Sequence, residues 1–277
     1  MFKTTVRLLM ITTALFAVAA CNREKAEMQG ESPPATGAVV PGKPADAAAP
    51  MDFSQKTEFA TVALTLPEAV KAQPDLHARL YSDEVRKLRQ FVEGAQSDRT
   101  EAGGEGLPAY EKTVTVTTAL ETGRLLSLKR TDFDFSGGAH PNTLFTSVLW
   151  DKALKQQLTP LRLFRTGADM SSLDNALCAA INAAKRARVP DSDTVVLGGK
   201  DWACPLAMET PFVLAPGNLG GKAGGLVFLI GAYQVGPYAE GAYEISVPQA
   251  VFRSLLAPAY ADEFGGAPLK VGDVTPG

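Results

Sequence analysis

The feature that most restricts the fold of this chain is a short glycine-rich segment between two stretches with strand character. Residues 131–135 alternate polar and aromatic side chains, and residues 143–150 return to a β-rich composition. Residues 136–142 between them read SGGAHPN. Adjacent glycines adopt backbone angles that a Cβ disfavours, and Pro141 fixes its own φ. The pattern predicts a tight connection between two strands that presents His140, one of only two histidines in the chain.

The hydrophobic pattern around this connection predicts an α+β fold with a mainly antiparallel sheet, two longer helices and the order β-α-β-β-β-α-β-β-β. A hydrophobic content of 45% is enough to bury a core. The predicted helices start at Pro74 and Ser171, and the predicted strands cover residues 58–66, 111–117, 124–135, 143–150, 210–214, 225–233 and 242–247.

Details of the two helices carry further expectations. The first helix is expected to break near Ser82, and His77 is expected to be a surface or boundary side chain. A hydroxyl is expected to cap the first turn of the second helix. Its last turn carries Lys185, Arg186 and Arg188, which suit the helix dipole. A binding role for this basic cluster is the alternative.

The N-terminus has the pattern of a secretory signal. Lys3 and Arg7 precede an apolar run to Ala20 that is too short to span a bilayer comfortably. The sequence VAAC at residues 18–21 resembles a bacterial lipobox, which implies cleavage before Cys21 and its lipidation. An ordinary signal peptide is the alternative. Asn22 favours the outer membrane, so the expected location is a cell-envelope lipoprotein at the outer membrane facing the periplasm.

Composition divides the remainder of the chain. Residues 21–52 are rich in Pro, Ala, Gly and Glu and are expected to form a disordered tether after the signal at 1–20. A small α/β subdomain at 53–105, a C-terminal domain at 106–260 and a loose tail at 261–277 follow. Without the signal, 25 basic residues face 30 acidic ones, a formal charge of −5. This balance argues against a general nucleic-acid binder.

Two cysteines lie in the predicted folded part. Cys178 falls in the second helix and Cys204 lies 26 residues further on. An isolated pair in an oxidising compartment favours a disulfide, whereas a metal or redox site requires closer spacing. The sequence therefore predicts a Cys178–Cys204 bridge and no cofactor.

The glycine–histidine segment, followed by a strand and by LRLF at residues 161–164, resembles a family of extracytoplasmic domains of unknown function. The family includes the C-terminal region of the anti-sigma factor RsiV and the N-terminal region of the deacetylase PdaC. GPYAEG at 236–241 and ISVP at 245–248 are similar to its second signature. The resemblance covers about residues 110–256, and 53–96 resembles the smaller domain that precedes it. It implies a link to cell-wall glycan or to lysozyme, but no reaction.

The two signatures define the candidate binding site. We expect their loops to lie near one another at one edge of the sheet. Tyr238 and Tyr243 are candidates to stack on a sugar or a partner protein, and Glu240 to accept hydrogen bonds; plain packing is the alternative. The candidate binding residues are Gly137, Gly138, His140, Asn142, Tyr238 and Glu240.

A catalytic interpretation rests on neighbouring acids. Asp132 and Asp134 lie two apart on a predicted strand, so both face one side, where His140 could join them in metal binding or acid–base work. A half-buried strand with a solvated face is the favoured alternative. A further catalytic interpretation, with Ser136 as nucleophile and His140 as base, is weaker, because no nucleophile elbow surrounds them.

The sequence thus favours a non-enzymatic, lipid-anchored envelope module that binds peptidoglycan or a lysozyme-like protein. A cell-wall glycan hydrolase and a structural partner of an envelope complex are the alternatives.

Overall fold

The computed structural model describes residues 49–101, 103 and 108–276. The signal peptide, Cys21 and most of the predicted tether lie outside the described residues. Within the described ranges, no helix has the length and apolar character needed to cross a membrane.

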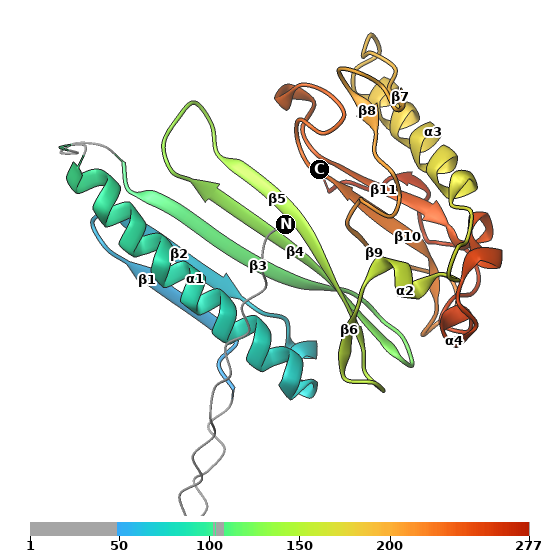
Figure 1. Ribbon diagram of the computed structural model, residues 1–277, viewed down its shortest axis with the longest axis horizontal. Helices are drawn as coiled ribbons and strands as arrows, with labels where there is room; N and C mark the ends of the chain where they lie inside the picture. Colours follow the sequence, from blue (N-terminus) through green and yellow to red (C-terminus); the bar gives the residue numbers. More distant parts are fainter. Residues whose placement is uncertain (1–48, 102, 104–107, 277) are drawn as a thin grey trace, which may run out of the picture. The chain divides into compact units, whose positions relative to one another are not determined.

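Six strands form the larger sheet, and their order in space follows the chain from β1 to β6 (Figure 1). β2 and β3 pair in parallel, and the other neighbours pair antiparallel. A parallel pair needs a long crossover, which the 3-10 helix η1 (Glu68–Ala72) and helix α1 (Pro74–Glu101) supply. The strands are β1 (Asp52–Lys56), β2 (Ala60–Thr65), β3 (Tyr110–Glu121), β4 (Leu125–Phe135), β5 (Asn142–Asp151) and β6 (Gln156–Leu158).

Helix α1 packs on one face of this sheet through an apolar stripe (Figure 1). Leu76, Leu88 and Val92 of the helix are buried with side chains of β2, β3 and β4. The helix runs without a break past Ser82 and is longer than the sequence pattern indicated. His77 was expected at the surface or boundary, but the residue is buried and its Nε2 lies 2.7 Å from the Pro50 carbonyl oxygen.

The predicted boundary between residues 105 and 106 falls between α1 and β3. Segments on both sides of it contribute strands to the six-stranded sheet.

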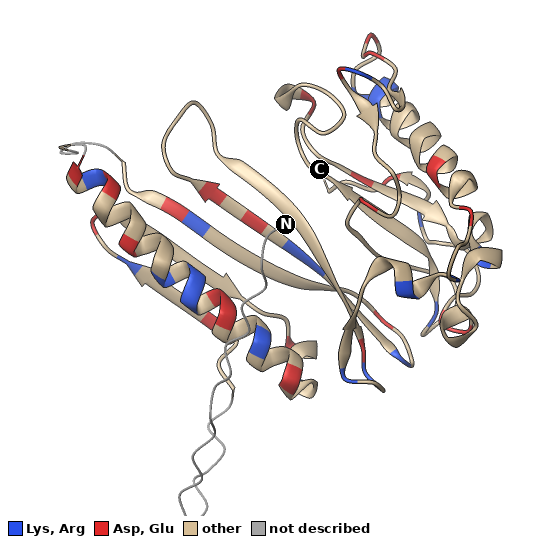
Figure 2. Cartoon of the chain, viewed as in Figure 1, with Lys and Arg blue, Asp and Glu red and all other residues tan. Residues whose placement is uncertain are grey.

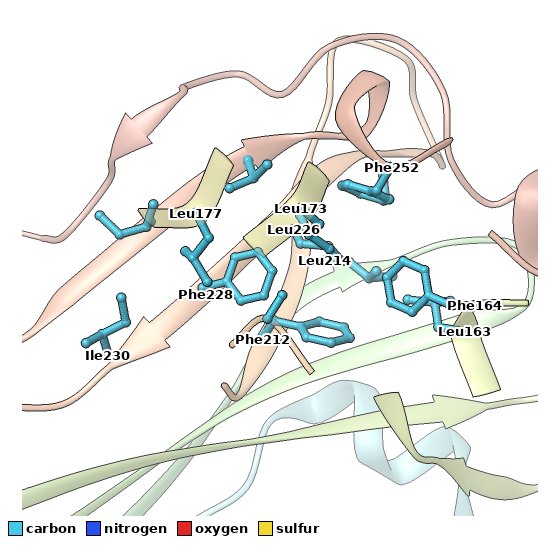
Figure 3. Close-up of a cluster of buried hydrophobic side chains, with 14 of the residues drawn as sticks. Leu163, Phe164, Leu173, Leu177, Phe212, Leu214, Leu226, Phe228, Ile230 and Phe252 are labelled. Carbon is cyan, nitrogen blue, oxygen red and sulfur yellow. The ribbon is translucent and has the colours of Figure 1, made fainter. Parts of the chain in front are cut away.

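A second sheet has the order β12-β11-β10-β9, and all its neighbours are antiparallel. Helix α3 (Ser171–Arg188) covers one face of it. Figure 3 shows Leu173 and Leu177 of α3 beside Leu226 and Phe228 of the sheet. The strands are β9 (Phe212–Pro216), β10 (Ala223–Ile230), β11 (Tyr243–Pro248) and β12 (Gly272–Asp273).

Short elements connect or flank these layers. The helical ones are α2 (Pro160–Leu163), η2 (Tyr238–Glu240), η3 (Gln249–Val251), η4 (Arg253–Leu255) and α4 (Pro258–Ala261). Strands β7 (Val196–Leu197) and β8 (Ala203–Cys204) pair in parallel as a separate ribbon.

The start of α3 differs from the expected hydroxyl cap. No side chain of the N-cap residue bonds to the first turn. The Ser171 hydroxyl instead donates to the Asp169 carboxylate, which also accepts the Ser171 amide N–H at 2.9 Å. Asp174 accepts the Ala207 amide N–H at 2.8 Å. Carboxylates therefore organise this helix end, and one of them bonds to a distant segment.

The expectation of a loose tail after Ala261 is also wrong. Phe264 is buried in the core beneath α3, and β12 pairs with β11. Arg188 at the end of α3 binds Asp273 at 2.8 Å. The last described residues therefore complete the second sheet.

The two sheets contact each other through β9, β10 and β11. The Leu214 amide N–H donates to Ser127 Oγ at 2.9 Å, and Phe145 packs against a buried cluster of β9 and β10 side chains. Lys129 and Glu244 add an ion pair between β4 and β11. These contacts place the end of the β4–β5 hairpin near the loops of the second sheet.

The fold class is confirmed as α+β with mostly antiparallel sheets and two longer helices. The predicted disulfide is confirmed as well. Cys178 in α3 and Cys204 in β8 are bonded, with their Cα atoms 5.3 Å apart. The bridge fixes the β7–β8 ribbon to the helix.

Candidate functional site

The connection between β4 and β5 is as tight as the sequence predicted. Gly137 and Gly138 have φ angles of 93° and 100°, which lie in the left-handed region. A Cβ at either position would have no atom within 4 Å, so the requirement for glycine is conformational rather than spatial. Asn142 begins β5 and is exposed.

His140 stacks on Tyr238 at the end of this connection. The ring centroids are 3.9 Å apart with an interplanar angle of 16°. The Tyr238 hydroxyl also donates to the Pro141 carbonyl oxygen at 3.0 Å. The prediction that the two signature loops lie near one another is therefore confirmed, and Tyr238 is held by both its ring and its hydroxyl.

Tyr233 is a third member of this aromatic cluster, and the sequence did not single it out. Its ring lies 5.4 Å from that of Tyr238 and 6.0 Å from that of His140, between centroids. The residue is 52% exposed and has a φ of 68°, which is strained for a non-glycine residue. The pattern had predicted a strand through Tyr233, but β10 ends at Ile230. Gly231, directly after Ile230, is the sequence signal that could have marked the turn that follows.

The hydrogen-bond partners of His140 indicate which tautomer of its ring is present. Nδ1 lies 3.0 Å from the Pro141 carbonyl oxygen, which only accepts, so Nδ1 carries a hydrogen. In the neutral ring Nε2 then accepts the Tyr233 hydroxyl at 3.2 Å. Both ring nitrogens are thus engaged, and neither is directed at Ser136 as a catalytic base would be. We refer to His140, Tyr233 and Tyr238 as the aromatic triad.

Glu240 lies beside the triad but is turned inward. Its Oε2 is 2.6 Å from the Lys185 Nζ and accepts the Tyr243 hydroxyl at 2.9 Å, and its side chain is 8% exposed. A Cβ at Gly236 would lie 2.6 Å from the Glu240 carboxylate, which explains this glycine. Lys185 also donates to the Val235 carbonyl oxygen at 2.7 Å. Glu240 therefore supports the loop instead of presenting its carboxylate at the surface.

Tyr243, the second tyrosine considered for stacking, is fully buried. The Arg188 guanidinium lies 3.9 Å from its ring centroid. Burial, and next the hydrogen bond to Glu240, raise the pKa of Tyr243 to about 12. Lys185 and Arg188 were explained from sequence by the helix dipole, but their main partners are tertiary: Glu240 for the first and Asp273 and Tyr243 for the second.

Asp132 and Asp134 share one face of β4, as predicted, and this is the face that α1 covers. Asp132 accepts from Arg130 at 2.7 Å, and Arg130 also binds Glu84 of α1 at 2.6 Å. Burial raises the pKa of Glu84, but the bonds from Arg130 and Lys87 outweigh it and lower that pKa overall. Glu84 and Asp132 therefore belong to one ion-pair network with Arg130.

Charged residues of both signs follow one another along α1 and β4 (Figure 2). Among the described residues, no three His, Cys, Asp or Glu side chains are placed to hold a metal ion together.

Two ranges of the chain are similar to known families. Residues 53–143 match the family described as deacetylase PdaC, and residues 162–250 match a family described as a protein of unknown function, DUF3298. The chain is therefore similar to the PdaC family over its first matched range and to the DUF3298 family over its second. His140 lies in the first matched range and both tyrosines of the triad lie in the second, so the aromatic triad joins residues of the two matched ranges.

Solved structures show the same fold. A DUF3298 family member from Bacteroides fragilis is 16% identical, with a TM-score of 0.52, and the match covers 76% of this chain and 94% of that one. A DUF3298 family protein from Pseudomonas aeruginosa is 15% identical with a TM-score of 0.52, covering 78% and 94%. No curated protein matches the chain.

Proposed function

We propose that this DUF3298 protein is a lipid-anchored, non-catalytic module of the cell envelope that binds peptidoglycan or a lysozyme-like protein through the aromatic triad. The observation that carries the proposal is the exposure of Tyr233 in a strained backbone conformation beside two other rings. Strain at an exposed residue persists where surrounding structure enforces it, and such positions gather at binding sites.

The chemistry of the triad favours the glycan of the two ligands. A tyrosine combines an apolar ring face with a hydroxyl, so it can pack on the C–H face of a sugar and also bond to its hydroxyls. A binding site of this kind needs a few fixed polar groups to orient its ligand. The side-chain amide of the exposed Asn142, which follows the glycine turn, is a candidate for this role.

The proposed lipid anchor at Cys21 and the proposed outer-membrane location rest on the sequence alone. Lipidation of Cys21 would supply more than one acyl chain, and two chains give stable membrane attachment where one does not. The residues between Cys21 and β1 would then separate the folded part from the outer membrane. Palmitate labelling of the wild-type chain and of Cys21→Ala tests this, and equal labelling of both would refute it.

Binding to isolated sacculi and to purified lysozyme, measured side by side, tests the function. Tyr233→Ala is expected to weaken binding to sacculi by about tenfold, the loss of roughly one aromatic contact. Tyr81→Ala removes a partly buried tyrosine on α1 and is the matched control, expected to bind as the wild type does. Equal binding by both variants would refute the role of the triad. Binding to lysozyme but not to sacculi would identify a lysozyme-like protein as the ligand.

The glycan-hydrolase alternative has a separate test. Release of soluble muropeptides from sacculi by the wild-type chain, and its loss in Asp134→Asn, would favour hydrolysis over binding. We expect no release above that of the buffer.

A further inference from the structure

The outer edge of β5 is open along most of its length. β5 has β4 as one neighbour and β6 as the other, but β6 pairs only with Leu149–Asp151. In the part of the chain that the structure describes, no strand pairs with residues 142–148 on that side. Every second residue of such an edge turns its N–H and C=O outward, which makes a template for another strand.

The chain leaves this edge at a defined point. β6 ends at Leu158, and Thr159 and Pro160 begin helix α2. Proline at the first turn of a helix has no N–H to continue a strand ladder. The backbone of this chain therefore does not occupy the position of a neighbouring strand beside residues 146–148.

A cavity of about 550 Å³ adjoins this position. Thr146 and Ser147 both line it, although consecutive side chains of a strand point to opposite faces. Contact with both places the cavity off the edge of the strand rather than above one face. The segment Met208–Phe212 forms the opposite wall, and the volume is within the usual range for ligand sites.

The lining offers polar groups that the described protein leaves unused. Ser147, Gln156 and Gln157 line the cavity, and their side chains have no hydrogen-bond partner among the described residues. Arg79 of α1 projects to the same cavity, is exposed, and forms no ion pair with any residue that the structure describes. Glu209 carries the opposite charge on the far wall.

We propose that this edge binds an extended peptide of a partner protein, which adds as a strand beside residues 146–148 of β5 and places an acidic side chain against Arg79. An extended peptide matches an open edge because its main chain supplies donors and acceptors at the strand repeat, while alternate side chains enter flanking pockets. The arginine selects the charge of one of them. This site is separate from the aromatic triad and does not depend on the function proposed for it.

Selection of a displayed library of random decapeptides on the full chain tests the proposal. We expect enriched peptides to carry an acidic residue at a constant position. Soluble copies should bind with shifts of the backbone amide resonances of residues 146–149, and N-methylation of their alternate amides that face β5 should weaken binding at least tenfold.

Single-site variants assign the charge contact. Arg79→Ala is expected to weaken the binding of the acidic peptides at least fivefold. Arg86→Ala, at another exposed arginine of α1, and Tyr233→Ala in the triad should leave peptide binding unchanged. Failure to enrich any peptide, or enriched peptides whose binding is indifferent to both N-methylation and Arg79→Ala, would overturn the proposal.

Discussion

Replacing Lys185 by methionine is expected to lower the free energy of unfolding by about 3–5 kcal/mol, the typical effect of breaking a buried ion pair from one side. The lysine side chain is 2% exposed and that of Glu240 is 8% exposed. Without the ammonium group, the Glu240 carboxylate remains buried with only the Tyr243 hydroxyl as a strong donor. The Val235 carbonyl oxygen loses its partner too.

For a protein of this size the loss corresponds to a decrease in Tm of roughly 6–20 °C. Denaturant unfolding of Lys185→Met, Glu240→Gln and the double variant gives the coupling energy of the pair. We expect the double variant to be more stable than the sum of the single changes predicts, by about 2 kcal/mol. The His140 ring resonances should also move in Lys185→Met, since η2 carries Tyr238, whose ring lies 3.9 Å from that of His140. A loss below 1 kcal/mol with an unshifted His140 would refute the structural role assigned to this pair.

Three further outcomes are expected. Gly138→Ala should cost about 1–2 kcal/mol in denaturant unfolding, because its φ of 100° is unfavourable for a residue with a Cβ; unchanged stability would contradict this. Reduction of the Cys178–Cys204 bond, which spans a sequence separation of 26, should destabilise by about 3–4 kcal/mol, and thermal melts with and without reductant should converge in a double serine variant. Burial raises the pKa of Asp151, but bonds from Arg124 and other donors lower it overall, so its stabilisation is present above its unfolded pKa of 3.8 and is lost as pH falls through the lower folded value. Urea unfolding between pH 5 and 2 should therefore show a steeper loss for the wild type than for Asp151→Asn, and parallel curves would count against it.

Local patterns were sufficient for the two long helices and for seven of the strands. The alternation before and after residues 136–142 predicted β4 and β5, and the apolar spacing from Leu173 to Ile181 predicted α3. The tight glycine turn followed from backbone sterics alone. The predicted disulfide needed only two cysteines and an oxidising compartment. In each case the determining interactions lie within a few residues or follow from composition.

Long-range partners decided what the sequence pattern missed. The buried His77 ring has its hydrogen-bond partner in the distant Pro50 carbonyl oxygen, and β12, after Ala261, pairs with β11. β2 and β3 are parallel because α1 connects them across the sheet. Neither periodicity nor composition records which distant segment will supply a partner.

The candidate site, too, was predictable only in part. Its location was predictable, since His140 and Tyr238 lie in the two signatures and do meet. The roles of individual residues were not. Glu240 was expected to bind a ligand, but its carboxylate pairs with Lys185 from another helix, whereas Tyr233 was overlooked and is 52% exposed.

The amino-acid sequence by itself determined the longer strand and helix segments, the glycine turn, the cysteine pair and the resemblance to a family of extracytoplasmic domains. Only the tertiary structure decided which side chains of the two signature loops face solvent and which are held in buried ion pairs. The physical reason is that a backbone preference is set by adjacent residues, while burial and pairing of a side chain depend on segments that are distant in the sequence, as Lys129 and Glu244 illustrate with a separation of 115.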